Sequence, residues 1–138
     1  RVLQVDGPEA LYRRPANGFV AAFVGGANRL GAAAEGARLP LAGGSLPLPG
    51  PVPEGHAVYA RPETLRLSAP GEGAPEGVVA AVVFQGTHHR VTVSGLAPEP
   101  VAVLHQGGPA PRIGERVAVT ADPGGILVLP ELRDDPAA

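Results

Sequence analysis

Glycine and proline interrupt this sequence at short intervals, which leaves little room for long helices. The 138 residues include 20 glycines and 17 prolines, about 27% together, and chains with this content but no repeat are often disordered. Leucine, isoleucine, valine and phenylalanine make up about 26% of the chain, however, and the formal net charge is only −2. Disordered chains instead combine few apolar residues with high net charge. We therefore expect one folded domain with many turns.

The apolar pattern after Asn28 is that of short strands, with no sustained helical period. Only five residues are aromatic, so the core must consist mainly of valine and leucine, and valine favours strands. We expect a mainly β, antiparallel domain. Its strands are predicted at residues 28–33, 37–41, 56–61, 65–67, 77–84, 89–94, 100–104, 116–120 and 126–129.

The clearest pair of strands flanks the turn Gln85-Gly86-Thr87. In the second of these strands, strict alternation places Val91 and Val93 on one face. The uninterrupted apolar run 78–83 in the first is typical of a strand covered on both faces, as in the core of a barrel.

Two segments, 42–55 and 68–76, hold much of the glycine and proline and are predicted to be exposed connections. Residues 43–51 are proline-rich. A proline-rich ligand is one interpretation of this stretch, and a spacer between strands is the favoured one.

The first 26 residues differ from the rest. A short strand and two short helices are predicted there, the first helix ending before Pro15, since the residue before a proline avoids helical geometry. The second helix would carry an apolar stripe of Phe19, Val20, Phe23 and Val24, which needs a surface to pack against. The chain contains no methionine, so we expect it to be a piece of a longer protein.

The composition excludes several chemistries. Without cysteine there are no disulfides, thiolate metal sites or cysteine nucleophiles. All 11 basic residues are arginine, so the phosphate-binding loop that needs a lysine is absent, as are the common hydrolase and metalloprotease motifs. No apolar run is long enough to span a membrane, and the acidic residues and scattered arginines of the first 30 residues lead us to expect no signal peptide. The near-neutral charge does not favour nucleic acid or an acidic membrane as a partner.

The histidines are the natural candidates for chemistry. His88 and His89 are adjacent, and on a strand their side chains would point to opposite faces, so both cannot reach one metal ion. A site would need one of them with His56, His105 or Glu99. We therefore predict no metal site.

Arg61-Pro62-Glu63 follows a predicted strand, and the favoured interpretation is a strand terminator, because proline removes a ladder donor. The alternative is a contact with an anion or a partner through Arg61. The candidate regulatory or ligand contacts are Arg61, Glu63, His88, His89 and Arg90.

Residues 4–25, QVDGPEALYRRPANGFVAAFVG, closely resemble the end of the nucleotide-binding domain in ATPase subunits of ABC importers of the maltose, spermidine and ferric-iron type. That family carries Gln-x-Gly-x-Pro-x-x-Leu/Ile-Tyr-x-x-Pro-x-x-x-Phe-Val-Ala-x-Phe-Ile/Val-Gly, followed by Asn and Leu, here Asn28 and Leu30. One departure is Asp6, which stands where the family has its first Gly, with Gly7 following.

The remainder resembles the C-terminal regulatory region of the same family, the OB-like TOBE domain. The matching motifs are Arg-Pro-Glu-x-Leu at 61–65, the hairpin Gly-x-Val to Phe-x-Gly at 77–86, and Gly-x-x-Val at 114–117. The phosphate loop, signature sequence and catalytic glutamate of such ATPases have no counterpart in these residues.

The resemblance implies three parts: residues 1–26 as the tail of a nucleotide-binding domain, 27–132 as a small OB-like antiparallel β-barrel, and 133–138 as a frayed tail. It implies a non-catalytic regulatory and dimerisation domain in a spermidine/putrescine-like or ferric-iron-like importer. The implied partners are a second copy, its own nucleotide-binding domain and, indirectly, transmembrane permease subunits. ATP and Mg would belong to the parent ATPase, with no cofactor in this part, at the cytoplasmic face of the bacterial inner membrane.

Two alternatives stay open. A small-ligand sensor of the same transporter would bind an oxyanion or a polyamine through Arg61 and the His88–Arg90 turn. An OB-type nucleic-acid module is the remoter alternative, because such grooves need basic charge and stacking aromatics, and only Tyr59 and Phe84 lie in the β part.

Overall fold

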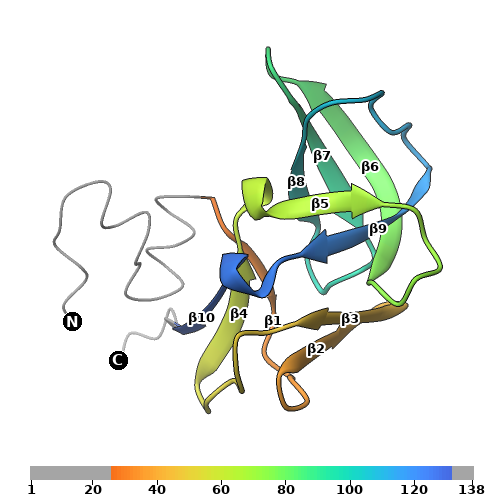
Figure 1. Cartoon of the computed structure of the whole chain (residues 1–138). Coiled ribbons are helices and arrows are strands. Elements are labelled where there is room, and N and C mark those ends of the chain that lie inside the picture. Colours follow the sequence, from red (N-terminus) through yellow and green to blue (C-terminus); the bar gives the residue numbers. More distant parts are fainter. Residues whose placement is uncertain (1–25, 132–138) are drawn as a thin grey trace, which may run out of the picture.

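The structure, a computed structural model, describes residues 26–131 (Figure 1). The predicted helical junction with Phe19, Val20, Phe23 and Val24 therefore lies outside the described residues, as does the predicted tail. Within the described range the chain forms β1 (Asn28–Gly31), β2 (Arg38–Leu41), β3 (Gly44–Pro47), β4 (His56–Ala60), η1 (Pro62–Thr64), β5 (Leu65–Ser68), β6 (Glu76–Phe84), β7 (His89–Ser94), β8 (Val101–His105), β9 (Arg116–Ala121), η2 (Pro123–Gly125) and β10 (Ile126–Pro130).

The strands form three antiparallel sheets with the orders β1-β4-β10, β2-β3 and β5-β9-β6-β7-β8. The five-stranded sheet curls until β8 packs against β5, although no ladder joins these two strands in the described part of the chain. The mainly β, antiparallel fold class predicted from the sequence is confirmed. The result is a strongly curled five-stranded sheet that stays open between β5 and β8.

Two corners carry the chain between the sheets. β4 leads through η1 into β5, and β9 leads through η2 into β10, while β4 pairs with β10 and β5 with β9. Each turn begins with a proline whose carbonyl accepts the N–H of the next strand's first residue, Leu65 at η1 and Ile126 at η2. Proline has a fixed φ and no N–H, so it ends the ladder and starts the turn. The strand terminator predicted at Arg61-Pro62-Glu63 is the first of these corners.

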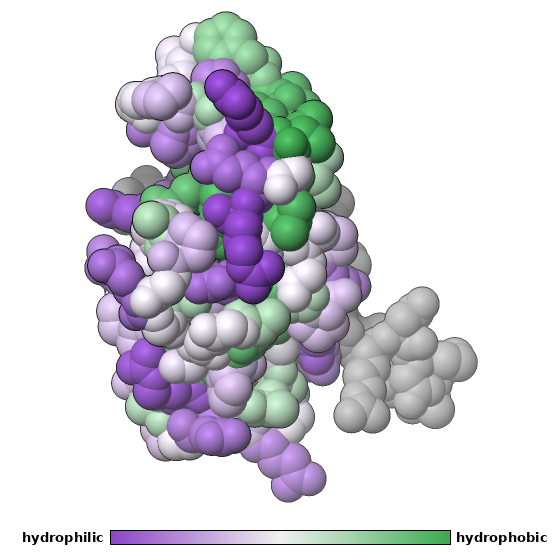
Figure 2. All heavy atoms as spheres, turned by 90° about the vertical axis from the view of Figure 1, so that its right-hand side faces the viewer, coloured by the Kyte–Doolittle hydropathy of each residue, from purple (hydrophilic) through white to green (hydrophobic). Residues whose placement is uncertain are grey.

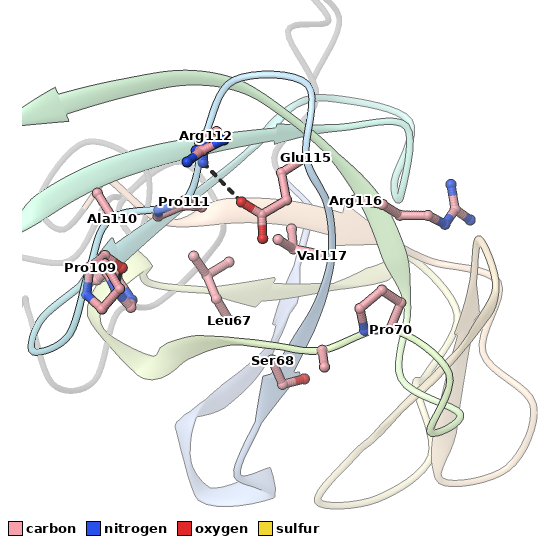
Figure 3. Close-up of a pocket in the computed structure, with 12 residues that line it drawn as sticks. Leu67, Ser68, Pro70, Pro109, Ala110, Pro111, Arg112, Glu115, Arg116 and Val117 are labelled. Atoms are coloured by element: carbon pink, nitrogen blue, oxygen red, sulfur yellow. Dashed lines mark hydrogen bonds between the residues drawn. The ribbon is translucent and has the colours of Figure 1, made fainter.

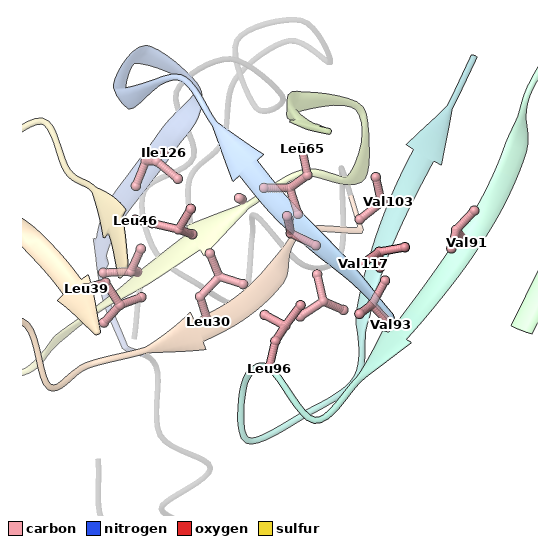
Figure 4. Close-up of a cluster of buried hydrophobic side chains, with 14 of the residues drawn as sticks. Leu30, Leu39, Leu46, Leu65, Val91, Val93, Leu96, Val103, Val117 and Ile126 are labelled. Carbon is pink, nitrogen blue, oxygen red and sulfur yellow. The ribbon is translucent and has the colours of Figure 1, made fainter. Parts of the chain in front are cut away.

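The core lies between the curled sheet and the smaller sheets (Figure 4). Val91 and Val93 share the inner face of β7, as their alternation predicted, and both are fully buried. They belong to one core cluster with inner side chains of the other elements, among them Leu30, Leu39, Leu46, Leu65, Val103, Val117 and Ile126.

One predicted connection is in part a strand. Residues 44–47 form β3, which pairs with β2 across the turn Ala42-Gly43, and Leu46 and Leu48 are buried. The prediction of an exposed segment over 42–55 was wrong at this point, because prolines hid the strand. Proline is acceptable here since the two-stranded sheet consists entirely of edge strands.

The predicted two-sided cover of residues 78–83 was also wrong. Val79 is buried, but Val78 is 37% exposed and Val83 is 53% exposed. Only one face of β6 meets the core, and its far end projects with β7 at the top of the molecule (Figure 1).

Candidate functional site

The first group of predicted contact residues lies at the η1 corner. The backbone carbonyl of Arg61 accepts hydrogen bonds from Thr64, through N–H at 3.0 Å and through Oγ1 at 2.9 Å. The Arg61 side chain is buried, and this burial lowers the pKa of its guanidinium. Glu63 lies within the turn and is exposed. Arg61 is therefore part of the structure of the η1 corner, with its side chain buried and not presented on the surface.

The second group lies in the β6–β7 hairpin, on different elements from the first. The His88 ring contacts its own hairpin, with Nε2 3.0 Å from Gln85 Oε1 and Nδ1 3.2 Å from Thr87 Oγ1. His89 packs its ring against Phe84, with 5.1 Å between the ring centroids, and Arg90 is exposed. These residues form part of the projecting hairpin.

His89 also stands directly opposite His105 in the β7–β8 ladder. Sequence reasoning named His105 only as one possible partner, because the pairing depends on the β7–β8 register. The His105 Nε2 lies 3.1 Å from the Pro109 carbonyl oxygen. No cluster of three or more His, Cys, Asp or Glu side chains suited to a metal ion occurs among residues 26–131.

A cavity of about 510 Å³ opens beside β5, β9 and the β8–β9 connection (Figure 3). Leu67 and Val117 contribute its apolar lining, and a proline-rich wall comes from residues 109–111. Arg112, Glu115 and Arg116 lie around it, and Glu115 Oε1 accepts the backbone N–H of Arg112 at 3.0 Å. This mixture of apolar lining and charged rim was not visible in the sequence.

Glu76 forms hydrogen bonds to three separate segments, which the sequence did not reveal. Its Oε2 accepts the Gly71 N–H at 2.7 Å, and its Oε1 accepts Arg116 Nε–H at 2.9 Å. Its own N–H donates to the Ala42 carbonyl at 2.8 Å. These bonds, the Gly71 N–H first, lower the pKa of the Glu76 carboxyl. The predicted exposed connection 68–76 is thereby tied to β9 and to the β2–β3 turn, and its Pro75 is fully buried.

The sequence relationships agree with this architecture. Residues 58–129 match the TOBE domain family, from within β4 to within β10. The chain belongs to the TOBE domain family. No helix in the described part of this TOBE domain is long and apolar enough to cross a bilayer.

Similar curated proteins are ATP-binding proteins of ABC transporters. The protein named "Fe(3+) ions import ATP-binding protein FbpC" of Escherichia coli K12 is 33% identical over 131 residues, and the one of the same name from Streptomyces avermitilis is 36% identical over 134. "Uncharacterized ABC transporter ATP-binding protein YdcT" of Escherichia coli K12 is 35% identical over 135. The alignments cover 93%, 94% and 97% of this chain but only 37%, 38% and 35% of the relatives. The chain thus spans about a third of the length of these relatives, and the predicted resemblance to the TOBE region of ABC importer ATP-binding subunits is confirmed.

Proposed function

We propose that this TOBE domain is the non-catalytic regulatory and dimerisation domain of the ATP-hydrolysing subunit of an ABC importer. The observation that carries the proposal is the match of nearly the whole chain to about a third of several ATP-binding proteins. Catalysis would then belong to the remaining two thirds, with ATP and Mg bound there. The described residues supply an apolar core and two proline turns that orient the sheets, which suits a structural part better than a catalytic one.

Ferric iron is the proposed transported solute. Two of the relatives described above carry Fe(3+) import in their names, whereas the earlier alternative of spermidine or putrescine has no counterpart among those names. The proposed partners are a second copy of the domain, its own nucleotide-binding domain and, through that domain, permease subunits. With these partners, the protein would lie peripherally at the cytoplasmic face of the bacterial inner membrane.

Sedimentation equilibrium of the 138-residue chain tests the dimerisation role. We expect a reversible monomer–dimer equilibrium between low micromolar and several hundred micromolar protein. A monomer over that whole range would contradict a direct role of this domain in holding two subunits together.

Anion sensing is a second candidate, and the cavity beside β9 is the observation that favours it. Arg112 and Arg116 line its charged side, and arginine suits oxyanions because of its planar set of N–H donors. Arg116 is already paired with Glu76, which weakens the case. Calorimetry with molybdate, sulfate, phosphate and polyamines tests this candidate, and the absence of heat across the panel would remove it.

A nucleic-acid role has little support. Tyr59, one of the two aromatic residues considered for base stacking, is buried at 5% exposure, which leaves Phe84 alone in the β part. Base-stacking surfaces combine several exposed aromatics with a basic groove. We expect no retardation of single-stranded DNA at low salt.

A further inference from the structure

The end of β6 forms a free strand edge. β9 pairs with β6 only over Glu76–Val78. At the next residue, Val79 N–H donates to the Glu115 carbonyl at 2.9 Å, and the Val79 carbonyl accepts Gly114 N–H at 2.8 Å. Beyond Val79, no other described residue pairs its backbone with β6 on this side.

The backbone groups on this edge can be assigned from the ladder. Val79 points its N–H and C=O away from β7, and a bulge follows it. At the other end, Gln85 N–H donates to the His88 carbonyl across the turn at 2.8 Å. Since successive residues of an antiparallel strand alternate in direction, Val82 and Phe84 direct their N–H and C=O groups outward, toward the free edge.

The side chains at this edge are apolar and exposed. Val83 is 53% exposed and Phe84 is 65% exposed, and Figure 2 shows apolar surface at the top and upper right of the face to which this edge belongs. Residues 77–88 contain neither a charged residue nor a proline. Edge strands that must stay single usually carry charge, proline or a cover, and this one lacks the first two.

We propose that this edge pairs antiparallel with the same edge of a second copy, centred on Val83, and so forms the contact of the dimerisation function proposed above. With this centre, Val82 stands opposite Phe84 of the second copy, and Phe84 opposite Val82. Each of these two pairs can exchange both backbone hydrogen bonds. The exposed Val83 side chains then meet each other on one face of the joined sheet.

A second copy fits this edge better than an unrelated strand does. Pairing of this edge with itself about Val83 is isologous and closes after two chains, so it leaves no open edge at β6 for further addition. Residues 77–88 place no charge at the two-fold axis itself, and the exposed Arg90, which stands opposite Val83, lies one strand away from it. The edge is short, and stable interfaces bury about 1,600 Å² in total, so we expect weak association in the isolated domain. Attachment to two ATP-binding subunits would strengthen it by raising the effective concentration.

Disulfide trapping tests the proposed register. The chain has no native cysteine, so Val83→Cys places a single thiol at the two-fold axis. Directly opposite residues that are not hydrogen-bonded have Cα atoms about 4.5 Å apart, within the range of about 4.4–6.8 Å for disulfides. Under mild oxidation we expect a cross-linked dimer from Val83→Cys and none from Val78→Cys, which lies on the same strand where β9 already covers the edge.

A charge variant tests the same edge without oxidation. We expect Val83→Lys to abolish the dimer in sedimentation equilibrium, because two like charges would meet at the axis, and Val83→Ile to retain it. Thermal unfolding of both variants checks that the fold persists. If Val83→Lys fails to fold, cross-linking of the nearly isosteric Val83→Cys decides whether the β6 edge forms the contact. Suppose that the wild type and Val83→Lys both dimerise and that Val83→Cys does not cross-link. Pairing through the β6 edge would then be wrong, while the dimerisation function would stand. A strictly monomeric wild type overturns both.

Discussion

The Asn28 side chain joins β1 to two other strands at once. Its Nδ2 donates to the Ala60 carbonyl at 3.2 Å and to the Ala102 carbonyl at 2.8 Å, and its Oδ1 accepts Ala102 N–H at 2.9 Å. The amide thus pairs with Ala102 on the outer edge of β8 as the backbone of another strand would, and it anchors β1 against the curled sheet.

Asn28→Asp tests this anchor with almost no change in shape. A carboxylate cannot donate, so two carbonyl acceptors lose their partner and face a negative charge. We expect the free energy of unfolding at neutral pH to fall by about 1–3 kcal/mol, measured by urea denaturation. An unchanged denaturation midpoint would show that the hydrogen bonds of the Asn28 amide do not stabilise the fold.

Glu76 links stability to pH. Its carboxyl has a lowered pKa in the folded chain, so the charged form is favoured by folding. Its contribution is fully present above the pKa of the unfolded chain, about 4.3, and is lost as pH falls through the lower folded value. We expect Glu76→Gln to have a lower melting temperature than wild type at pH 7, with the two converging in acid. If the difference in melting temperature between wild type and Glu76→Gln is the same at all pH values, the Glu76 carboxylate does not link stability to pH.

Local patterns predicted some residues well and others not at all. Val91 and Val93 were assigned correctly because alternation within one strand is a local signal. Glu76 could not be found, because Gly71 and Arg116 become its partners only when the connection folds back over β9. The position of His105 opposite His89 could not be predicted either, because it depends on the β7–β8 register, which the connecting loop sets.

At the level of elements, the two proline corners position the sheets relative to each other. They lie close together: a Cβ added at Gly125 would come within 2.9 Å of Thr64 Cβ, and Thr64 Oγ1 lies 3.4 Å from the Gly125 carbonyl oxygen. Glycine at 125 is therefore required by close approach, since a methyl group there would push the corners apart.

Two adjacent glycines provide a matched test of this contact. Gly125→Ala should destabilise the chain by about 1–3 kcal/mol through overpacking. Gly124→Ala, where an added Cβ meets nothing within 4 Å, should change stability by less than about 0.5 kcal/mol. Thermal melts of both variants decide the question, and equal effects would show that the spacing of the corners tolerates a side chain.

Most strands could be predicted because turn residues bound them, and β3 and β6 show the limits. Pro47 at its end and the glycines before it masked β3, and its place in a two-stranded sheet makes this proline harmless. The apolar run of β6 looked like a strand covered on both faces, but its burial depends on neighbours that sequence alone does not supply. β9 accompanies β6 over only three residues.

At the scale of the whole molecule, the fold extends beyond the range that matches the TOBE family. That range begins at residue 58, yet Leu30, Leu39 and Leu46 from β1, β2 and β3 are buried in the same core as Val93. The strands before residue 58 therefore belong to the same cooperative unit.

Truncation tests this claim. A chain that begins at His56, and so keeps all of β4, should lose cooperative thermal unfolding, because three fully buried leucines and the pairing of β1 with β4 are removed. A chain lacking only residues 1–25 should keep a cooperative transition. Cooperative melting of the shorter fragment would show that β1 to β3 are an accessory to the fold.

If this domain helps to hold two ATP-binding subunits together, as proposed, its removal should weaken the dimer of the whole subunit. The most direct measurement compares complete ATP-binding subunits that carry this domain with subunits truncated before it, by sedimentation equilibrium without nucleotide. We predict dimers for the complete subunit, monomers for the truncated one, and weaker dimers for the complete subunit with Val83→Lys. Equal dimerisation with and without the domain would show that the domain does not hold the two subunits together.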